Sequence, residues 1–173
     1  MTATITAGDA RSTFVSDWLT TGFAVALSDG LFASATGLLI PPTVTPFRVF
    51  RGVASVAFGP EVIKGGVPWA LVGICMHICV GLFWSGLFVA ALYTFPRMRS
   101  IIRTLPGAFA IAIPYGLSIW LFMSLVFIPS MLHRPPTITP KWWVQLIGHI
   151  PFVVGPMILV NRRRQASLNI EGI

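Results

Sequence analysis

Four long apolar runs constrain this chain more than any other feature of its sequence. They cover residues 18–40, 67–93, 105–128 and 142–160, and each has the roughly 20 residues that a helix needs to cross a bilayer. A single segment in lipid can pair all its backbone hydrogen-bonding groups only as an α-helix. The sequence therefore predicts an all-α membrane protein, a bundle of four transmembrane helices.

Composition supports the same class. Hydrophobic residues make up 55% of the chain and charged residues 10%, and the mean hydropathy is +0.82, which is far from the values of soluble domains. A chain of 173 residues has room for one bundle of about four spans, so we expect a single membrane domain over residues 1–173. The net charge of +7 comes from short basic clusters between the runs and not from a nucleic-acid-binding fold, so we expect no nucleic-acid partner.

The distribution of basic residues predicts the orientation. With four spans both termini lie on one side, and the arginines on that side cluster at the helix ends. They are Arg11, Arg97, Arg99, Arg103, Arg162, Arg163 and Arg164. The positive-inside rule then places both termini in the cytoplasm and the chain in the bacterial inner membrane. We interpret the first run as a retained span and not as a cleaved signal peptide, because Arg11 alone precedes it to balance Asp9 and Asp17.

A shorter amphipathic segment at residues 46–58 follows the first run. Its apolar residues repeat at helical spacing, while Arg48 and Arg51 fall on the other side. This pattern predicts an interfacial helix whose two arginines bind lipid headgroups. A helix packed over the mouth of the bundle is the alternative interpretation.

Small residues recur every four positions in the first two runs. Such rows let helices approach closely where lipid gives no hydrophobic drive for association, so we expect the two rows to face each other. They consist of Gly22, Ala26, Gly30 and Ser34 in the first helix, and of Gly73, Gly81 and Ser85 in the second. His77 occupies the position between Gly73 and Gly81, so its imidazole is predicted to point toward protein.

Polar side chains in three of the runs form the main candidate site. At a rise of about 1.5 Å per residue, Asp29 lies roughly 16 Å deep from the side of the termini, while His77 and His149 lie roughly 15 Å and 10 Å from the opposite side. Titratable groups at such depth are costly and turn toward protein. We therefore predict a shared intramembrane polar layer of Asp29, His77 and His149, with Tyr115 as a candidate hydrogen-bond partner.

Several chemistries fit this layer. A buried carboxylate and imidazole can simply satisfy each other and fix helix packing. His77 and His149 could instead be axial ligands of a haem or a chlorin such as bacteriochlorophyll, although the chain has no Cys-x-x-Cys-His attachment motif. A metal site is not expected, because no two of the three ligands share a helix at a spacing of three or four residues. A proton relay or small transporter is a further alternative.

Enzymatic signatures are missing from the sequence. It contains no Gly-x-Ser-x-Gly elbow and no His-Glu-x-x-His helix, and it has five acidic residues in all. We therefore expect no enzymatic activity.

Several short motifs resemble those of a group of small four-span bacterial membrane proteins. They are Gly52-Val53-Ala54, Gly59-Pro60, Gly65-Gly66, Ala70-Leu71-Val72-Gly73 with His77, Pro114-Tyr115-Gly116, His149, and Gly155-Pro156. The resemblance covers residues 29–164 and implies a four-helix fold without implying an activity. In the third helix this chain has Ser124 where that group tends to have Asn.

A small apolar bundle with short termini and no soluble domain has the profile of an accessory subunit. We therefore expect a non-catalytic component of a larger electron-transport or photosynthetic membrane complex, packed against other subunits and the lipid bilayer and holding lipid or pigment. A haem- or chlorin-binding protein that uses His77 and His149 is the alternative, followed by a small transporter.

Overall fold

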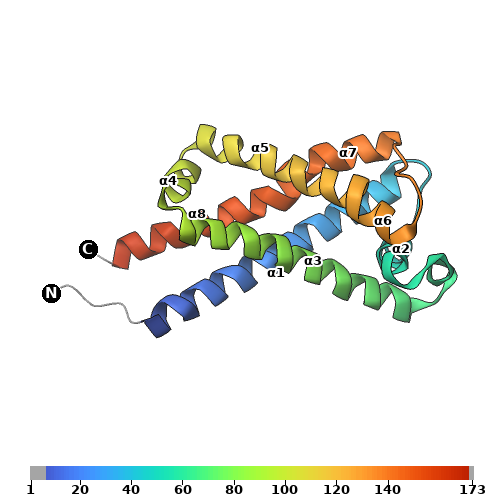
Figure 1. Cartoon of the computed structure of the whole chain (residues 1–173), viewed down its shortest axis with the longest axis horizontal. Coiled ribbons are helices and arrows are strands. Elements are labelled where there is room, and N and C mark those ends of the chain that lie inside the picture. The colour runs from blue at the N-terminus through green and yellow to red at the C-terminus, as the bar shows by residue number, and fades with distance from the viewer. Residues whose placement is uncertain (1–6, 172–173) are drawn as a thin grey trace.

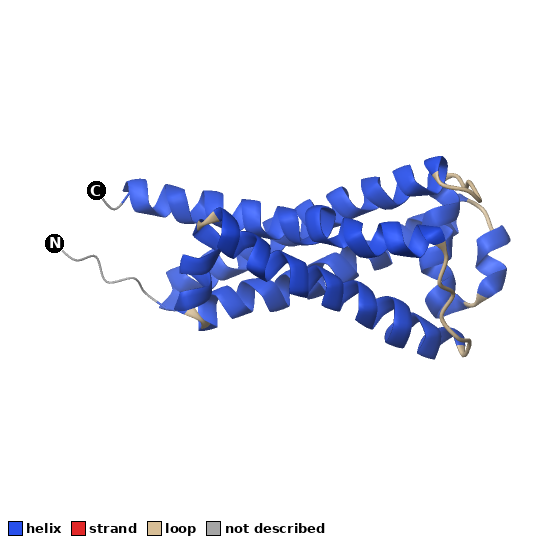
Figure 2. Ribbon diagram, turned by 90° about the horizontal axis from the view of Figure 1, so that it is seen from above, coloured by secondary structure: helices blue, strands red, loops and turns tan. Residues whose placement is uncertain are grey.

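The computed structural model describes residues 7–171, with side chains described for residues 13–166. Within that part the chain is helical and contains no β-strand. Four of its helices are long and apolar enough to cross a membrane, namely Thr13–Leu39, Val67–Thr94, Leu105–Leu132 and Pro140–Ala166. The predicted all-α bundle of four transmembrane helices is thus confirmed. The two ends of the described chain lie at the same end of the elongated bundle (Figures 1 and 2).

The first two spans are continuous helices, and the last two contain a wider turn. The first is α1 (Ala7–Leu39) and the second is α3 (Val67–Thr94). The third consists of α5 (Leu105–Leu121), the π-helical segment η2 (Phe122–Phe127) and α6 (Ile128–Leu132). The fourth consists of α7 (Pro140–His149), the π-helical segment η3 (Ile150–Val154) and α8 (Gly155–Glu171).

Proline accounts for the widened turn of the fourth span. Pro151 lies inside η3 and Pro156 is the second residue after it, and neither can donate the backbone hydrogen bond that continues an α-helix. In the third span Pro114 is accommodated within α5, and the wider turn η2 comes later, just before Pro129. π-helical turns in otherwise regular helices are frequent at functional sites.

The amphipathic segment forms α2 (Pro46–Phe58), with the predicted bounds. Thr45 caps its N-terminus by accepting a hydrogen bond from the amide of Arg48 at 3.4 Å, and Gly59 ends it with a φ of 89° that suits glycine. The helix packs on α3 and α1 at the end of the bundle away from the termini (Figure 1). The structure therefore shows this helix packed over the end of the bundle, and its position in the lipid headgroup plane stays a prediction.

Two short helices were not predicted from the sequence. Residues Pro60–Lys64 form the 3₁₀ helix η1, and residues Pro96–Arg103 form α4 between the second and third spans. In α4, Ile102 is fully buried, and Arg99 donates to the carbonyl of Leu92 at 2.6 Å and stacks over the ring of Tyr93. Eight residues are too few for helical periodicity to distinguish this segment from a loop.

An apolar core fills the half of the bundle nearer the termini. It joins α1, α3 and α4 to α5 and η2 of the third span and to η3 and α8 of the fourth. Its buried members are Val25, Phe88, Leu92, Ile102, Ala108, Ala112, Ile119, Val153, Val154, Met157 and Ile158.

The small-residue rows bring α1 and α3 together over part of their length. A Cβ atom added to Gly81 would lie 3.3 Å from the Cβ of Ala26, and one added to Gly22 would meet Leu82. Ser85 is fully buried in α3, whereas Ser34 is half-buried.

The packing partner of Gly73 differs from the expectation. This glycine packs against the backbone of Phe50 in α2 and not against α1, because α2 crosses α3 at this height. The small-residue row of α3 therefore serves two different neighbours.

A polar cluster ties the spans together at the terminal end. The carboxylate of Asp17 is buried and accepts hydrogen bonds from the Tyr93 hydroxyl at 3.0 Å and from the guanidinium of Arg164. Arg164 also donates to the hydroxyl groups of Ser16 and Thr20. One buried carboxylate thus links α1, α3 and α8.

Candidate intramembrane binding cavity

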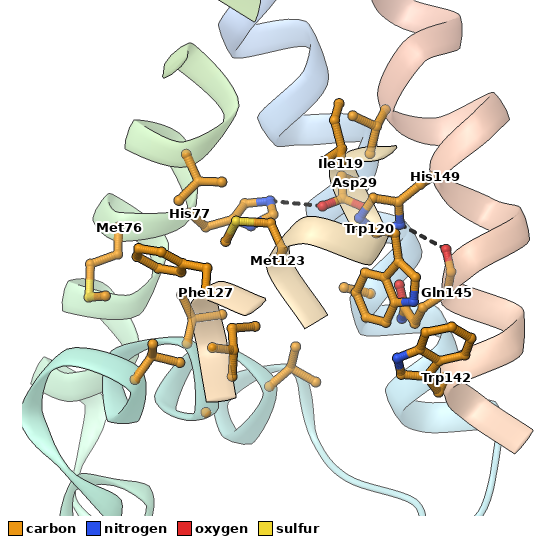
Figure 3. A pocket seen from close by; sticks show the side chains of 18 of the residues that line it. Asp29, Met76, His77, Ile119, Trp120, Met123, Phe127, Trp142, Gln145 and His149 are labelled. Atoms are coloured by element: carbon orange, nitrogen blue, oxygen red, sulfur yellow. Dashed lines mark hydrogen bonds and ion pairs between the residues drawn. The ribbon is translucent and has the colours of Figure 1, made fainter. Parts of the chain in front are cut away.

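A cavity of about 560 Å³ lies in the half of the bundle away from the termini. All four spans, α2, η1 and the loop before α7 contribute to its walls, and most of its lining is apolar (Figure 3). Small-molecule sites in proteins typically occupy about 300–1,000 Å³, are mainly apolar and contain a few polar groups. By size and lining, this cavity is the candidate binding site.

Asp29 and His77 lie side by side in the cavity wall. The Nε2 atom of His77 is 3.1 Å from the carbonyl oxygen of Ala26 and 3.8 Å from Oδ2 of Asp29. Because a carbonyl oxygen only accepts hydrogen bonds, Nε2 of His77 carries a hydrogen. Gly30 gives the imidazole room, since a Cβ there would lie 3.4 Å from Nε2.

His149 contributes the second imidazole. The residue is 7% exposed, and its Nδ1 donates to the carbonyl of Gln145 at 2.8 Å, so Nδ1 carries the hydrogen of the neutral ring. In the neutral ring Nε2 is then the hydrogen-bond acceptor. Figure 3 shows Asp29 between the imidazoles of His77 and His149. The structure therefore places all three predicted residues around one cavity.

Four buried polar atoms of the lining have no partner among the described residues. They are Oδ1 of Asp29 and the indole Nε1 atoms of Trp84, Trp120 and Trp142. Buried polar atoms are normally hydrogen-bonded, because removal from water without a new partner is costly. The residues that line the cavity thus include one carboxylate oxygen and three N–H groups whose hydrogen bonds the described residues leave unmade.

The aromatic wall was not predicted from the sequence. Trp120 packs against His149 with ring centroids 4.7 Å apart, and Trp142 packs behind it at 6.1 Å. No tryptophan was assigned to the site from the sequence. Helical spacing was a signal for one of them, because Trp142 and His149 are seven residues, or two turns, apart on one helix face.

Tyr115 takes a different place from the one expected. Its hydroxyl donates to the backbone carbonyl of Trp84 at 2.8 Å, and its ring packs against Phe88 of the apolar core. It is absent from the described lining of the cavity. The polar layer therefore consists of Asp29, His77 and His149, and Tyr115 belongs to the core beside it.

The basic residues near the cavity lie in different environments. Arg48 is exposed, as a lipid-facing residue would be, but Arg51 is half-buried and donates to the carbonyl of Gly65. Arg134 and Lys141 line the cavity at its loop end, where Lys141 donates to the carbonyl of Pro42 at 3.0 Å. The loop end of the cavity is therefore positively charged.

A metal centre does not emerge from these residues. Over the described part of the chain, no three His, Cys, Asp or Glu side chains lie close enough to hold a metal ion. Cys75 and Cys79 are exposed on α3, and both are free thiols.

Comparisons with known proteins found no match, so the function is inferred from the geometry of the site. The chain matches no family model, no curated protein and no solved structure. The resemblance to small four-span bacterial membrane proteins stays a prediction.

Proposed function

We propose that this protein is a non-catalytic membrane subunit that holds one lipophilic molecule between its helices. The observation that carries the proposal is the set of four unpartnered buried atoms, from Asp29 and three tryptophans, around a mainly apolar cavity. A purely structural packing layer would give each of these atoms a hydrogen-bond partner within the protein. The apolar walls suit the body of a lipid or pigment, and the unpaired atoms suit a polar group on it.

The geometry does not favour haem or chlorin ligation by both histidines. Two axial imidazoles must face each other across a flat macrocycle, but Asp29 lies between His77 and His149 (Figure 3). The Nε2 atom of His77 is also engaged with the carbonyl of Ala26. The residues therefore do not fit a macrocycle clamped between the two rings.

Holding a molecule is better supported than conducting a solute. Val25, Ile119 and Val153 line the cavity and also belong to the apolar core that fills the terminal half of the bundle. An ion or polar solute leaving the cavity toward the termini would have to cross this core.

Filling the cavity is the direct test of the proposal. Gly52 of α2 lines the cavity, and a Cβ added there meets nothing within 4 Å, so a Gly52→Leu side chain enters open space. We expect wild-type protein extracted into native nanodiscs to retain one lipophilic molecule by native mass spectrometry. We expect Gly52→Leu to fold normally and to lose it.

Ala57→Leu is the matched control, because Ala57 is an exposed residue of the same helix outside the described cavity lining. This variant should keep the bound molecule. Equal occupancy in Gly52→Leu, Ala57→Leu and wild type would contradict the proposal.

The accessory role is a separate part of the proposal. We infer that the chain packs against larger subunits of an electron-transport or photosynthetic complex, because the described fold has no soluble domain through which to act alone. Extraction in a mild detergent should then show the chain migrating with a complex several times its mass of 18.8 kDa. Recovery solely as a monomer or homodimer would count against it.

The orientation is likewise proposed. Arg97, Arg103 and Arg163 are exposed at the end of the bundle that holds the termini. By the positive-inside rule that end faces the cytoplasm, and the cavity then opens toward the periplasmic half of the inner membrane.

A further inference from the structure

Two residues that line the cavity, Asp29 and His149, each carry a hydrogen-bond acceptor. Oδ1 of Asp29 is buried and unpaired, and Nε2 of His149 is the acceptor of a ring whose hydrogen is on Nδ1. Figure 3 shows the Asp29 carboxylate on the side of His77 that faces His149. A molecule bound here must therefore present hydrogen-bond donors to both side chains.

The charges of the lining favour a positively charged donor at this point. Asp29 is the single acidic residue of the described lining, and its neighbour His77 is 3.8 Å away, beyond the length of a strong charge-assisted hydrogen bond. A carboxylate in an apolar cavity is stabilised by a cation in direct contact. Arg134 and Lys141 lie at the loop end of the cavity, two turns of α7 away from His149, and Lys141 is bonded to Pro42.

The aromatic wall fits the same charge. Trp120 packs on His149 and Trp142 packs behind Trp120, so indole rings border the space beside the two acceptors. Cations are attracted to the face of an aromatic ring, and tryptophan is the strongest of these partners.

We propose that the molecule held in this cavity is a lipophilic amine whose ammonium group lies between Asp29 and His149. The inference rests on the proposed function and specifies the ligand class. A primary ammonium group has three N–H donors and can serve both acceptors at once, whereas a neutral hydroxyl has one hydrogen and leaves one acceptor unpaired.

The flank of the cavity that faces lipid gives such a molecule a route that avoids the basic loop end. Met76 of α3 and Met123 and Phe127 of η2 line this flank (Figure 3). Methionine side chains are unbranched and adapt to different shapes, so they can move aside for a ligand from the bilayer.

The test compares an amine with its neutral analogue. The full chain is purified in phosphatidylcholine nanodiscs and titrated with 2-(2-naphthyl)ethylamine or with 2-(2-naphthyl)ethanol, with dissociation constants from calorimetry. We expect the amine to bind at least about tenfold more tightly than the alcohol. Asp29→Asn should weaken amine binding by about tenfold to a hundredfold, the effect of losing a hydrogen bond between charged groups, and weaken alcohol binding by a smaller factor.

The controls separate this inference from the proposed function. Glu61→Gln changes an exposed carboxylate of η1 outside the described lining and should leave both dissociation constants unchanged. Should Asp29→Asn fail to fold, a displacement experiment gives the same test. The amine should displace the molecule that co-purifies with the wild-type protein, and the alcohol should not. Equal binding of amine and alcohol, with no effect of Asp29→Asn, would overturn the amine inference and leave the proposed function intact. Binding of neither probe, together with full retention of the native molecule in Gly52→Leu, would overturn both.

Discussion

Gly73→Val is expected to lower the free energy of unfolding by about 3 kcal/mol, the upper end of the usual cost of overpacking. A Cβ at Gly73 would overlap the backbone carbonyl of Phe50, where α2 crosses α3. Backbone atoms within a helix cannot move aside as the end of a long side chain can. The two helices must therefore separate, and α2 must lose part of its packing on the bundle.

Thermal unfolding of the purified protein in detergent measures this effect. Gly52→Val is the matched control. Like Gly73, Gly52 is a glycine inside a helix, here α2, but it has open space where a Cβ would be. We expect a clearly lower melting temperature for Gly73→Val and a near-native one for Gly52→Val. Equal melting temperatures would show that α2 does not pack on α3 at this position.

Asp17→Ala is the second change with a large expected effect, a loss of about 2–3 kcal/mol. The carboxylate is buried, whereas the Arg164 side chain is 31% exposed, so the penalty is smaller than for a fully buried pair. Its removal takes from the Tyr93 hydroxyl its acceptor and from the Arg164 guanidinium its ion pair with Asp17. The ends of α1, α3 and α8 should then separate more easily.

Unfolding in a denaturing detergent, followed by circular dichroism, measures this loss. Glu61→Ala removes an exposed carboxylate and should cost less than about 0.5 kcal/mol. Because Asp17 and Tyr93 share one hydrogen bond, the effects of Asp17→Ala and Tyr93→Phe should not add in the double variant. Additive effects, or an Asp17→Ala protein as stable as wild type, would contradict the proposed link between the helices.

The helix boundaries followed from the sequence because lipid imposes strict conditions on a spanning segment. The apolar runs predicted at residues 67–93 and 105–128 correspond in the structure to the spans Val67–Thr94 and Leu105–Leu132. The ends of α2 were readable from local chemistry, since Thr45 with Pro46 starts the helix and Gly59 ends it. The helix α4 gave no comparable signal, because it is short and lies among turn residues.

The candidate site was only partly predictable. Counting residues along a helix gives the depth of a side chain, which is how Asp29, His77 and His149 could be placed at similar heights. Rotation about the helix axis is harder to predict, because a helix in lipid can be apolar on all sides and then lacks an amphipathic pattern. Tyr115 was assigned to the wrong neighbours for this reason, whereas Gly73 was because the path of α2 across α3 could not be predicted.

The wider turns add a second uncertainty. Each π-helical turn inserts an extra residue and rotates the side chains that follow it relative to those before it. η2 and η3 lie in the two spans that supply Trp120, Met123 and His149 to the cavity. An assignment of faces by regular α-helical spacing therefore fails across these turns.

An electron-density map of the protein, crystallised from a lipidic mesophase after gentle extraction from its own membrane, tests the central claim most directly. We predict continuous density for a lipophilic molecule in the cavity, ending within hydrogen-bonding distance of Oδ1 of Asp29 and Nε2 of His149. A map in which protein side chains fill this space, or in which Asp29 and His149 turn outward toward lipid, would contradict the account.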